Sequence, residues 1–144
     1  MLRACVCLLL LLAGVLGPAF AQAPTEGSLS GTVKDVEGAG KANVQVKVFV
    51  DGFAQGQAVT GADGSYSLTY SYDPAADVSI IVWYVPPAGF VPELVVLRES
   101  TRARQMGLWS PCVVRAPLAP SVTHDAVVYT ESGKFDALSQ SGCL

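Results

Sequence analysis

Side chains that could act in catalysis are few in this 144-residue sequence. Its single histidine, His124, lies in the alternating run Val-Thr-His-Asp-Ala-Val, where a strand-edge position is more common than a general base. No Gly-x-Ser-x-Gly segment frames a nucleophilic serine. Asp35, Asp51 and Asp63 each stand at a turn, where a carboxylate accepts hydrogen bonds from nearby backbone N–H groups. We therefore predict no catalytic residues and a protein that is not an enzyme.

The same residues do not compose a metal site. Calcium needs several converging oxygen ligands, and the sequence has no Asp-x-Asp-x-Asp run. Zinc needs a set of Cys and His ligands, which a single histidine leaves short. We therefore predict no metal and no other cofactor.

Arginines offer a different chemistry, the binding of an anionic group. Arg98, Arg102 and Arg104 lie close together in a chain whose net charge is -3. Such a cluster is either a solvated loop or helix face, or a patch for an anion. The acidic balance of the whole chain argues against a nucleic-acid partner, because proteins that bind nucleic acids usually present a basic surface.

Aromatic residues offer a third chemistry, since exposed rings stack on sugars or anchor a protein partner. Tyr66, Tyr70 and Tyr72 share one face of an alternating segment, and Trp83, Tyr84 and Trp109 follow along the chain. In a β-sandwich such a face is more often core than contact surface, and both interpretations stay open here. The candidate contact residues are Tyr70, Tyr72, Arg98, Arg102, Arg104 and Trp109.

The N-terminus has the three parts of a secretory signal peptide. Arg3 supplies a positive charge, residues 4–16 are apolar, and Ala19-Phe20-Ala21 is a small-residue cleavage site. The apolar run is shorter than the roughly 20 residues of a transmembrane span. We predict that residues 1–21 are removed between Ala21 and Gln22. The mature chain would then be exported (secreted, periplasmic or at the cell surface) without attachment to the membrane.

Cleavage would leave two cysteines, Cys112 and Cys143. Disulfides form in the oxidising compartments that exported proteins reach, so we predict that these two residues pair. The alternative is a pair of free thiols, one of them catalytic. The bridge would hold a polar C-terminal tail, residues 132–144, against the region near Cys112.

The elements that must position all these residues are mostly strands. Period-two alternation at 28–34, 43–50, 57–60 and 65–72, interrupted by Asp-Gly and other glycine turns, predicts antiparallel strands. Residues 78–85 carry apolar side chains on both faces of the expected strand: Val78, Ile80 and Val82 on one, and Ile81, Trp83 and Val85 on the other. This pattern is typical of a central strand covered on both sides. Further strands are expected at 91–97, 112–118 and 124–130, with a short helix at 99–106. The pattern predicts an all-β, seven- to eight-stranded antiparallel sandwich.

Three segments resemble the carboxypeptidase regulatory-like domain family. They are Ser30-Gly-Thr-Val-Lys-Asp35, the Val-x-Val-x-Val strand at 44–48, and Thr60-Gly-Ala-Asp-Gly-Ser-Tyr-Ser-Leu68. The resemblance implies a transthyretin-like (prealbumin-like) sandwich, which is also grouped with carbohydrate-binding-like folds. It also implies an N-terminal linker at 22–27, a domain at 28–131 with an insertion at 86–111, and the C-terminal tail. The matched positions make turns and core, so they confer no activity by themselves.

These observations lead to two functional hypotheses. The first is an exported, non-catalytic sandwich module with a structural or protein-interaction role. The second is a carbohydrate-binding module, which the tyrosines and the resemblance to carbohydrate-binding-like folds would allow. The partner is accordingly an unknown protein or glycan.

Overall fold

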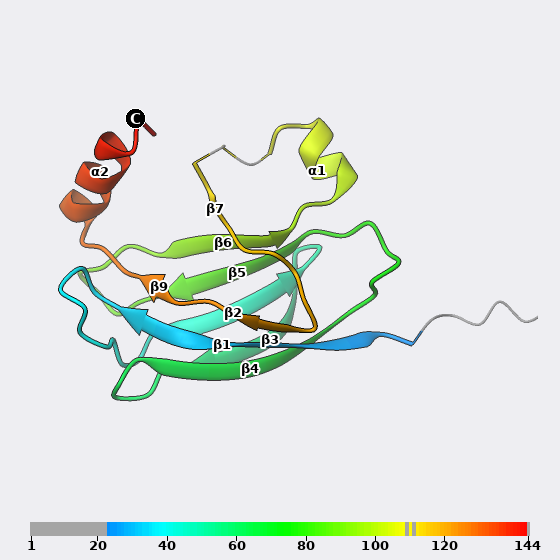
Figure 1. The fold of residues 1–144 in the computed structure, drawn as a ribbon, viewed down its shortest axis with the longest axis horizontal. Helices are drawn as coiled ribbons and strands as arrows, with labels where there is room; N and C mark the ends of the chain where they lie inside the picture. Colours follow the sequence, from blue (N-terminus) through cyan, green and yellow to red (C-terminus); the bar gives the residue numbers. More distant parts are fainter. Residues whose placement is uncertain (1–22, 109, 111, 144) are drawn as a thin grey trace, which may run out of the picture.

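Two β-sheets pack face to face in the computed structural model, which describes residues 23–108, 110 and 112–143 (Figure 1). The first sheet has the order β4-β1-β8, with β9 also paired to β1. Its strands are β1 (Thr25–Lys34), β4 (Ser65–Tyr72), β8 (Ser121–Thr123) and β9 (Ala126–Val127). The predicted signal peptide and its Ala21–Gln22 cleavage site lie outside the described residues.

The second sheet has the order β3-β2-β5-β6-β7. Its strands are β2 (Gln45–Val50), β3 (Phe53–Val59), β5 (Ile80–Val85), β6 (Glu93–Arg98) and β7 (Val114–Arg115). The β2–β3 hairpin turns at Asp51-Gly52, where both residues have positive φ (50° and 85°). Two such residues in succession make the type of turn whose twist matches that of the flanking strands.

Two short helices lie on the β6 side of the sandwich (Figure 1). Helix α1 (Thr101–Gln105) begins after Ser100, whose hydroxyl accepts a hydrogen bond from the Ala103 N–H. Helix α2 (Glu131–Gln140) begins after Thr130, which caps the Gly133 N–H in the same way. Both helices therefore have a hydroxyl N-cap, which satisfies a backbone donor that the helix leaves free.

The core lies between the inner faces of the two sheets. Leu29 and Val33 of β1 and the inward residues of β4 face Val46 and Val48 of β2 and Val82 of β5. The buried phenols take polar partners: the hydroxyls of Tyr66 and Tyr84 lie 2.8 Å apart, and the Tyr66 hydroxyl donates to the His124 carbonyl at 2.7 Å. Burial raises the pKa of Tyr66 to about 12 and shifts the pKa of Tyr84 in the same direction.

The predicted all-β sandwich and the short helix after β6 are confirmed. The pairings of β8 and β9 with β1, and of β7 with β6, are parallel, which differs from the all-antiparallel expectation. A parallel pair needs a crossover connection of a dozen or more residues. The chain between β6 and β7, which includes α1, supplies one, so the segment interpreted as an insertion carries the chain back to the edge of the sheet.

Several predicted boundaries differ from the structure: the strand expected at 57–60 is β3, four residues longer at its start, and only two residues of the strand expected at 112–118 are strand, as β7. Three other segments differ for reasons that the contacts show. The linker at 22–27 is partly strand, because β1 already pairs with β4 at Thr25. The tail at 132–144 is mostly helix α2. The strand expected at 124–130 is interrupted, because the Asp125 carboxylate accepts hydrogen bonds from the Thr32 N–H at 2.8 Å and the Thr32 hydroxyl at 2.9 Å. Between β8 and β9, the Asp125 side chain thus accepts the hydrogen bond of the Thr32 N–H in place of a backbone carbonyl. The same hydrogen bonds hold the pKa of Asp125 below its ordinary value.

Candidate interaction surface

The outer face of the first sheet is lined by hydroxyl groups. Ser28, Ser30 and Thr32 of β1 stand opposite Thr69, Ser67 and Ser65 of β4. The inward neighbours of these residues are the buried side chains of the core, so the two strands alternate between apolar and polar positions. This is the usual arrangement for an antiparallel sheet with one face in water.

The outer face of the second sheet has the opposite character. Trp83 and Ile81 of β5 point away from the core, and β2 contributes Phe49 to the same face. Leu94 of β6 pairs with Trp83 on its other side. Together with Gly52 these residues line an open groove of about 430 Å³. We call this surface the Trp83 face, defined by Phe49, Ile81, Trp83 and Leu94.

Trp83 is the central aromatic group of the Trp83 face. Its side chain leaves 43% of its surface exposed, although the neighbouring positions Val82 and Tyr84 are fully buried on the other side of the strand. The Phe49 ring meets it edge to face, with ring centroids 6.3 Å apart and planes at 68°. Lys47 lies beside Trp83 on β2. The ring is therefore held by neighbours on one side and open to another molecule.

The prediction that 78–85 is covered on both sides is wrong for this face. Alternation correctly places Ile80, Val82 and Tyr84 in the core. In the described part of the chain, however, the opposite side of β5 stays partly open at Ile81 and open at Trp83. Trp83 is thus a contact candidate that the sequence analysis did not select. Its signal was a tryptophan on the second apolar face of the strand, opposite the face of Val82 and Tyr84.

The tyrosines selected from sequence are not available for contact. Tyr70 and Tyr72 keep only 2% and 7% of their surface exposed, and their rings stack at 5.7 Å inside the core. The reason is that the polar members of the same alternation, the serines and Thr69, take the outer face of β4. Trp109, the remaining aromatic candidate, lies outside the described residues.

The predicted arginine cluster is divided by the structure. Arg98 and Arg104 line one open cavity, which Arg115 completes from β7. Arg102 is exposed on the same helix as Arg104 but does not line this cavity. Arg115 was missed because it is distant in sequence and joins the cavity only through the parallel pairing of β6 with β7.

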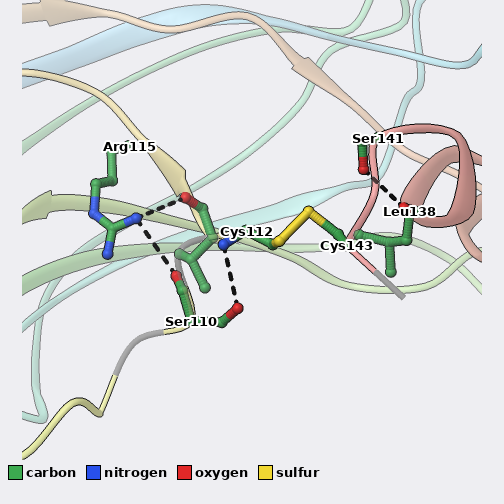
Figure 2. Close-up of a disulfide and its surroundings, with 7 residues drawn as sticks. Ser110, Cys112, Arg115, Leu138, Ser141 and Cys143 are labelled. Atoms are coloured by element: carbon green, nitrogen blue, oxygen red, sulfur yellow. Dashed lines mark hydrogen bonds between the residues drawn. A yellow bond between two sulfur atoms is a disulfide. The ribbon is translucent and has the colours of Figure 1, made fainter.

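The disulfide between Cys112 and Cys143 is present (Figure 2). It joins the segment before β7 to the end of α2. The Cys143 N–H donates to the Leu138 carbonyl at the C-terminal end of the helix. A second tie is the ion pair between Lys134 and Glu93. No residue of helix α2 is fully buried, although Leu138 is partly buried, so these two links contribute much of its attachment to the sheets.

His124 lies half-buried at the end of β8. Its ring is 6.0 Å from the Tyr84 ring, and its carbonyl accepts the Tyr66 hydrogen bond described above. Burial lowers the pKa of His124. Among residues 23–108, 110 and 112–143, no three His, Cys, Asp or Glu side chains come close enough to bind a metal ion together. The geometry around His124 is that of a packed strand end.

Comparison with known proteins found similarity at the level of structure. No protein-family model matches the chain, and the search of curated proteins found no match. The chain is similar to the dioxygenase domain of a dioxygenase–carbohydrate-binding protein fusion from the cellulolytic bacterium Streptomyces sp. SirexAA-E. The two are 20% identical with a TM-score of 0.49, and the match covers 75% of this chain and 82% of that one.

This comparison contradicts the prediction that the chain is not an enzyme, because the similar structure is a dioxygenase domain. The prediction was drawn from missing catalytic motifs, and such an absence does not settle catalysis in either direction. A likeness of this strength assigns no reaction and no ligand to the chain. Separately, no helix in the described ranges is long and apolar enough to cross a membrane.

Proposed function

We propose that this chain is an exported β-sandwich module that binds another protein through the Trp83 face. The observation that carries the proposal is the contrast between the two outer faces, one lined by hydroxyls and the other by apolar side chains. Contiguous apolar side chains that a sheet face leaves open to water can mark an interaction site. The Cys112–Cys143 disulfide supports export, because disulfides persist in oxidising compartments.

The chemistry of the Trp83 face favours a protein over a carbohydrate. Partly exposed tryptophans surrounded by apolar neighbours are the typical anchors of protein interfaces. Carbohydrate sites combine an aromatic platform with polar groups that fix the sugar, and the lining of this groove is apolar. The burial of Tyr70 and Tyr72 also removes the pair on which the carbohydrate hypothesis depended.

We also propose membership of the carboxypeptidase regulatory-like domain family. Its support is the placement of the three resembling segments in one sandwich. The first lies in β1, the second in β2, and the third forms the turn into β4 and the start of that strand. The matched residues Val33, Val46 and Leu68 are buried, as expected for positions that build a core.

The binding proposal is tested by adding a charge to each outer face in turn. Trp83→Asp places a carboxylate on the Trp83 face, and Ser67→Asp places the same group on the hydroxyl face. Each purified protein would be coupled through its N-terminus and exposed to the exported proteins of its source organism. Proteins retained by the unmodified chain would be quantified by mass spectrometry. A glycan array would be probed with the same three proteins.

We expect Ser67→Asp to retain the same protein as the unmodified chain and Trp83→Asp to lose it. Thermal unfolding checks that both variants are folded, and Trp83→Gln replaces Trp83→Asp if the latter is not. Equal retention by all three proteins would refute the Trp83 face as the binding surface. Retention of a glycan that Trp83→Asp abolishes would replace the protein partner by a carbohydrate.

A further inference from the structure

Three arginines from separate elements line one open cavity of about 700 Å³, which we call the arginine cavity. Arg98 ends β6, Arg104 belongs to α1, and Arg115 ends β7. Glu99 is the acidic residue of the lining, and Val96, Leu97, Ala116 and Pro117 form the remaining wall. The cavity is thus positive in a chain whose net charge is -3.

Two of the guanidinium groups are held in place by backbone carbonyls. Arg98 donates to the carbonyls of Pro74 and Ala76 in the loop before β5. Arg115 donates to the Val113 carbonyl at 3.2 Å and, at 3.5 Å, to that of Ser110 (Figure 2). A guanidinium has five N–H donors in a planar fork, so each group keeps donors beyond those that these carbonyls occupy.

The charges of these two arginines are not neutralised by the described part of the chain. Its ion pairs are Asp35–Lys41, Glu99–Arg104 and Glu93–Lys134, and none includes Arg98 or Arg115. Carbonyl groups fix a guanidinium without cancelling its charge. The pair between Glu99 and Arg104 is itself long, at 3.7 Å, and exposed on the arginine side, so it is weak.

We propose that the arginine cavity binds an anionic group, namely a carboxylate, sulfate or phosphate. Fixed, planar guanidinium donors suit the paired oxygens of these groups, which arginine binds through two parallel hydrogen bonds. The group belongs either to a small free anion or to a polyanionic chain, and the two sources share this chemistry. The site does not depend on the Trp83 face, although β6 contributes to both, Leu94 to one and Arg98 to the other.

The test compares arginines inside and outside the cavity. Arg104→Gln and Arg102→Gln remove the same charge from the same helix, but only Arg104 lines the cavity. The unmodified chain with its disulfide intact, these two variants and Arg115→Gln would be titrated calorimetrically with inorganic phosphate, inorganic sulfate and citrate at low salt. Dextran sulfate would be titrated as the polyanionic probe. Circular dichroism confirms that each variant is folded.

We expect Arg115→Gln and Arg104→Gln each to weaken anion binding about fivefold, the upper range for an exposed charge pair. Arg102→Gln should leave the affinity unchanged. Saturable binding of a small anion identifies a free-anion site, and binding of dextran sulfate alone with the same arginine dependence identifies a polyanion site. The proposal is overturned if no probe binds, or if Arg102→Gln weakens binding as much as Arg115→Gln, since attraction would then come from overall charge.

Discussion

Replacing Cys112 and Cys143 together by serine should release helix α2 while the sandwich stays folded. No residue of the helix is fully buried. Its links to the sheets are the disulfide, the Lys134–Glu93 ion pair, the partly buried Leu138 and the bridge between Val91 and Tyr129 just before it. A single ion pair between partly exposed groups stabilises by about 1 kcal/mol or less. We therefore expect that, without the covalent link, the remaining contacts are too weak to keep the helix docked.

The size of the change in unfolding free energy depends on whether the unfolded chain alone, or also the folded chain, gains conformational entropy when the disulfide is removed. The two cysteines are 31 residues apart, and closing such a loop in the unfolded chain is worth about 3.7 kcal/mol in the chain-entropy model. That value assumes that the folded state keeps the loop closed. If α2 is released, the folded state regains much of the same entropy, so the free energy of unfolding should fall by less than about 2 kcal/mol.

Two measurements check this reasoning. Urea denaturation followed by tryptophan fluorescence gives the free energy of unfolding, and amide hydrogen exchange reports on α2 and the strands separately. The serine variant should lose protection in α2 and keep it in β1 and β5, and a thiol reductant should change the unmodified chain in the same way but not the variant. A loss of 3.7 kcal/mol or more, with faster exchange in β1, would refute the inference and make α2 part of the cooperative core.

Three further predictions concern the core. Tyr66→Phe should lower the free energy of unfolding by about 1–3 kcal/mol, because the Tyr84 hydroxyl and the His124 carbonyl each lose a hydrogen-bond partner. Urea denaturation measures this change, and an unchanged midpoint would contradict the prediction. Gly31→Ala should lower the free energy of unfolding by about 1–3 kcal/mol, measured by urea denaturation, because a Cβ there would lie 2.0 Å from the His124 carbonyl oxygen. The control is Gly61→Ala, whose Cβ would lie 3.4 Å or more from its neighbours and which should leave the midpoint nearly unchanged. Burial raises the pKa of Tyr66 and of Tyr70 to about 12, above the ordinary value of 10.0, so the unfolded chain releases these protons first. The contribution of these two tyrosines to the free energy of unfolding should be present in full below pH 10 and be lost as the pH rises toward 12. Phenolate absorbance measures the titration of the folded chain, and the prediction is wrong if every tyrosine titrates near pH 10.

Local patterns were sufficient to predict the strands that pair through short connections. The alternation of 65–72 gives β4 as observed, and the Asp51-Gly52 turn fixes the β2–β3 hairpin. In these segments the residues that determine burial and turn geometry are neighbours in the sequence. The same holds for α1, where Ser100 caps the first turn and Gly107 follows the last.

The C-terminal third could not be predicted in this way, because its structure depends on distant partners. Strand β8 is three residues long and exists through its pairing with β1, in which Ser121 lies opposite Ser28. Asp125 ends that pairing through Thr32, more than ninety residues away. Helix α2 lacks an apolar stripe because it packs little against the sheets, so no period in its sequence indicates a helix.

Strand β5 shows why the contact surface was missed, and what the mistake implies. Its apolar residues on both faces indicated that both would be covered, and the chain covers the side of Val82 and Tyr84. Periodicity reports that a side chain favours burial but does not report which molecule buries it. In the complex that we propose, the partner covers Ile81 and Trp83, so that β5 is covered on both sides, as its sequence predicted. The hydroxyl face of β4 needs no partner to cover it, because its exposed serines form hydrogen bonds with water. Interaction surfaces of this kind are therefore found by comparing the faces of sheets within one molecule, after the core has been assigned.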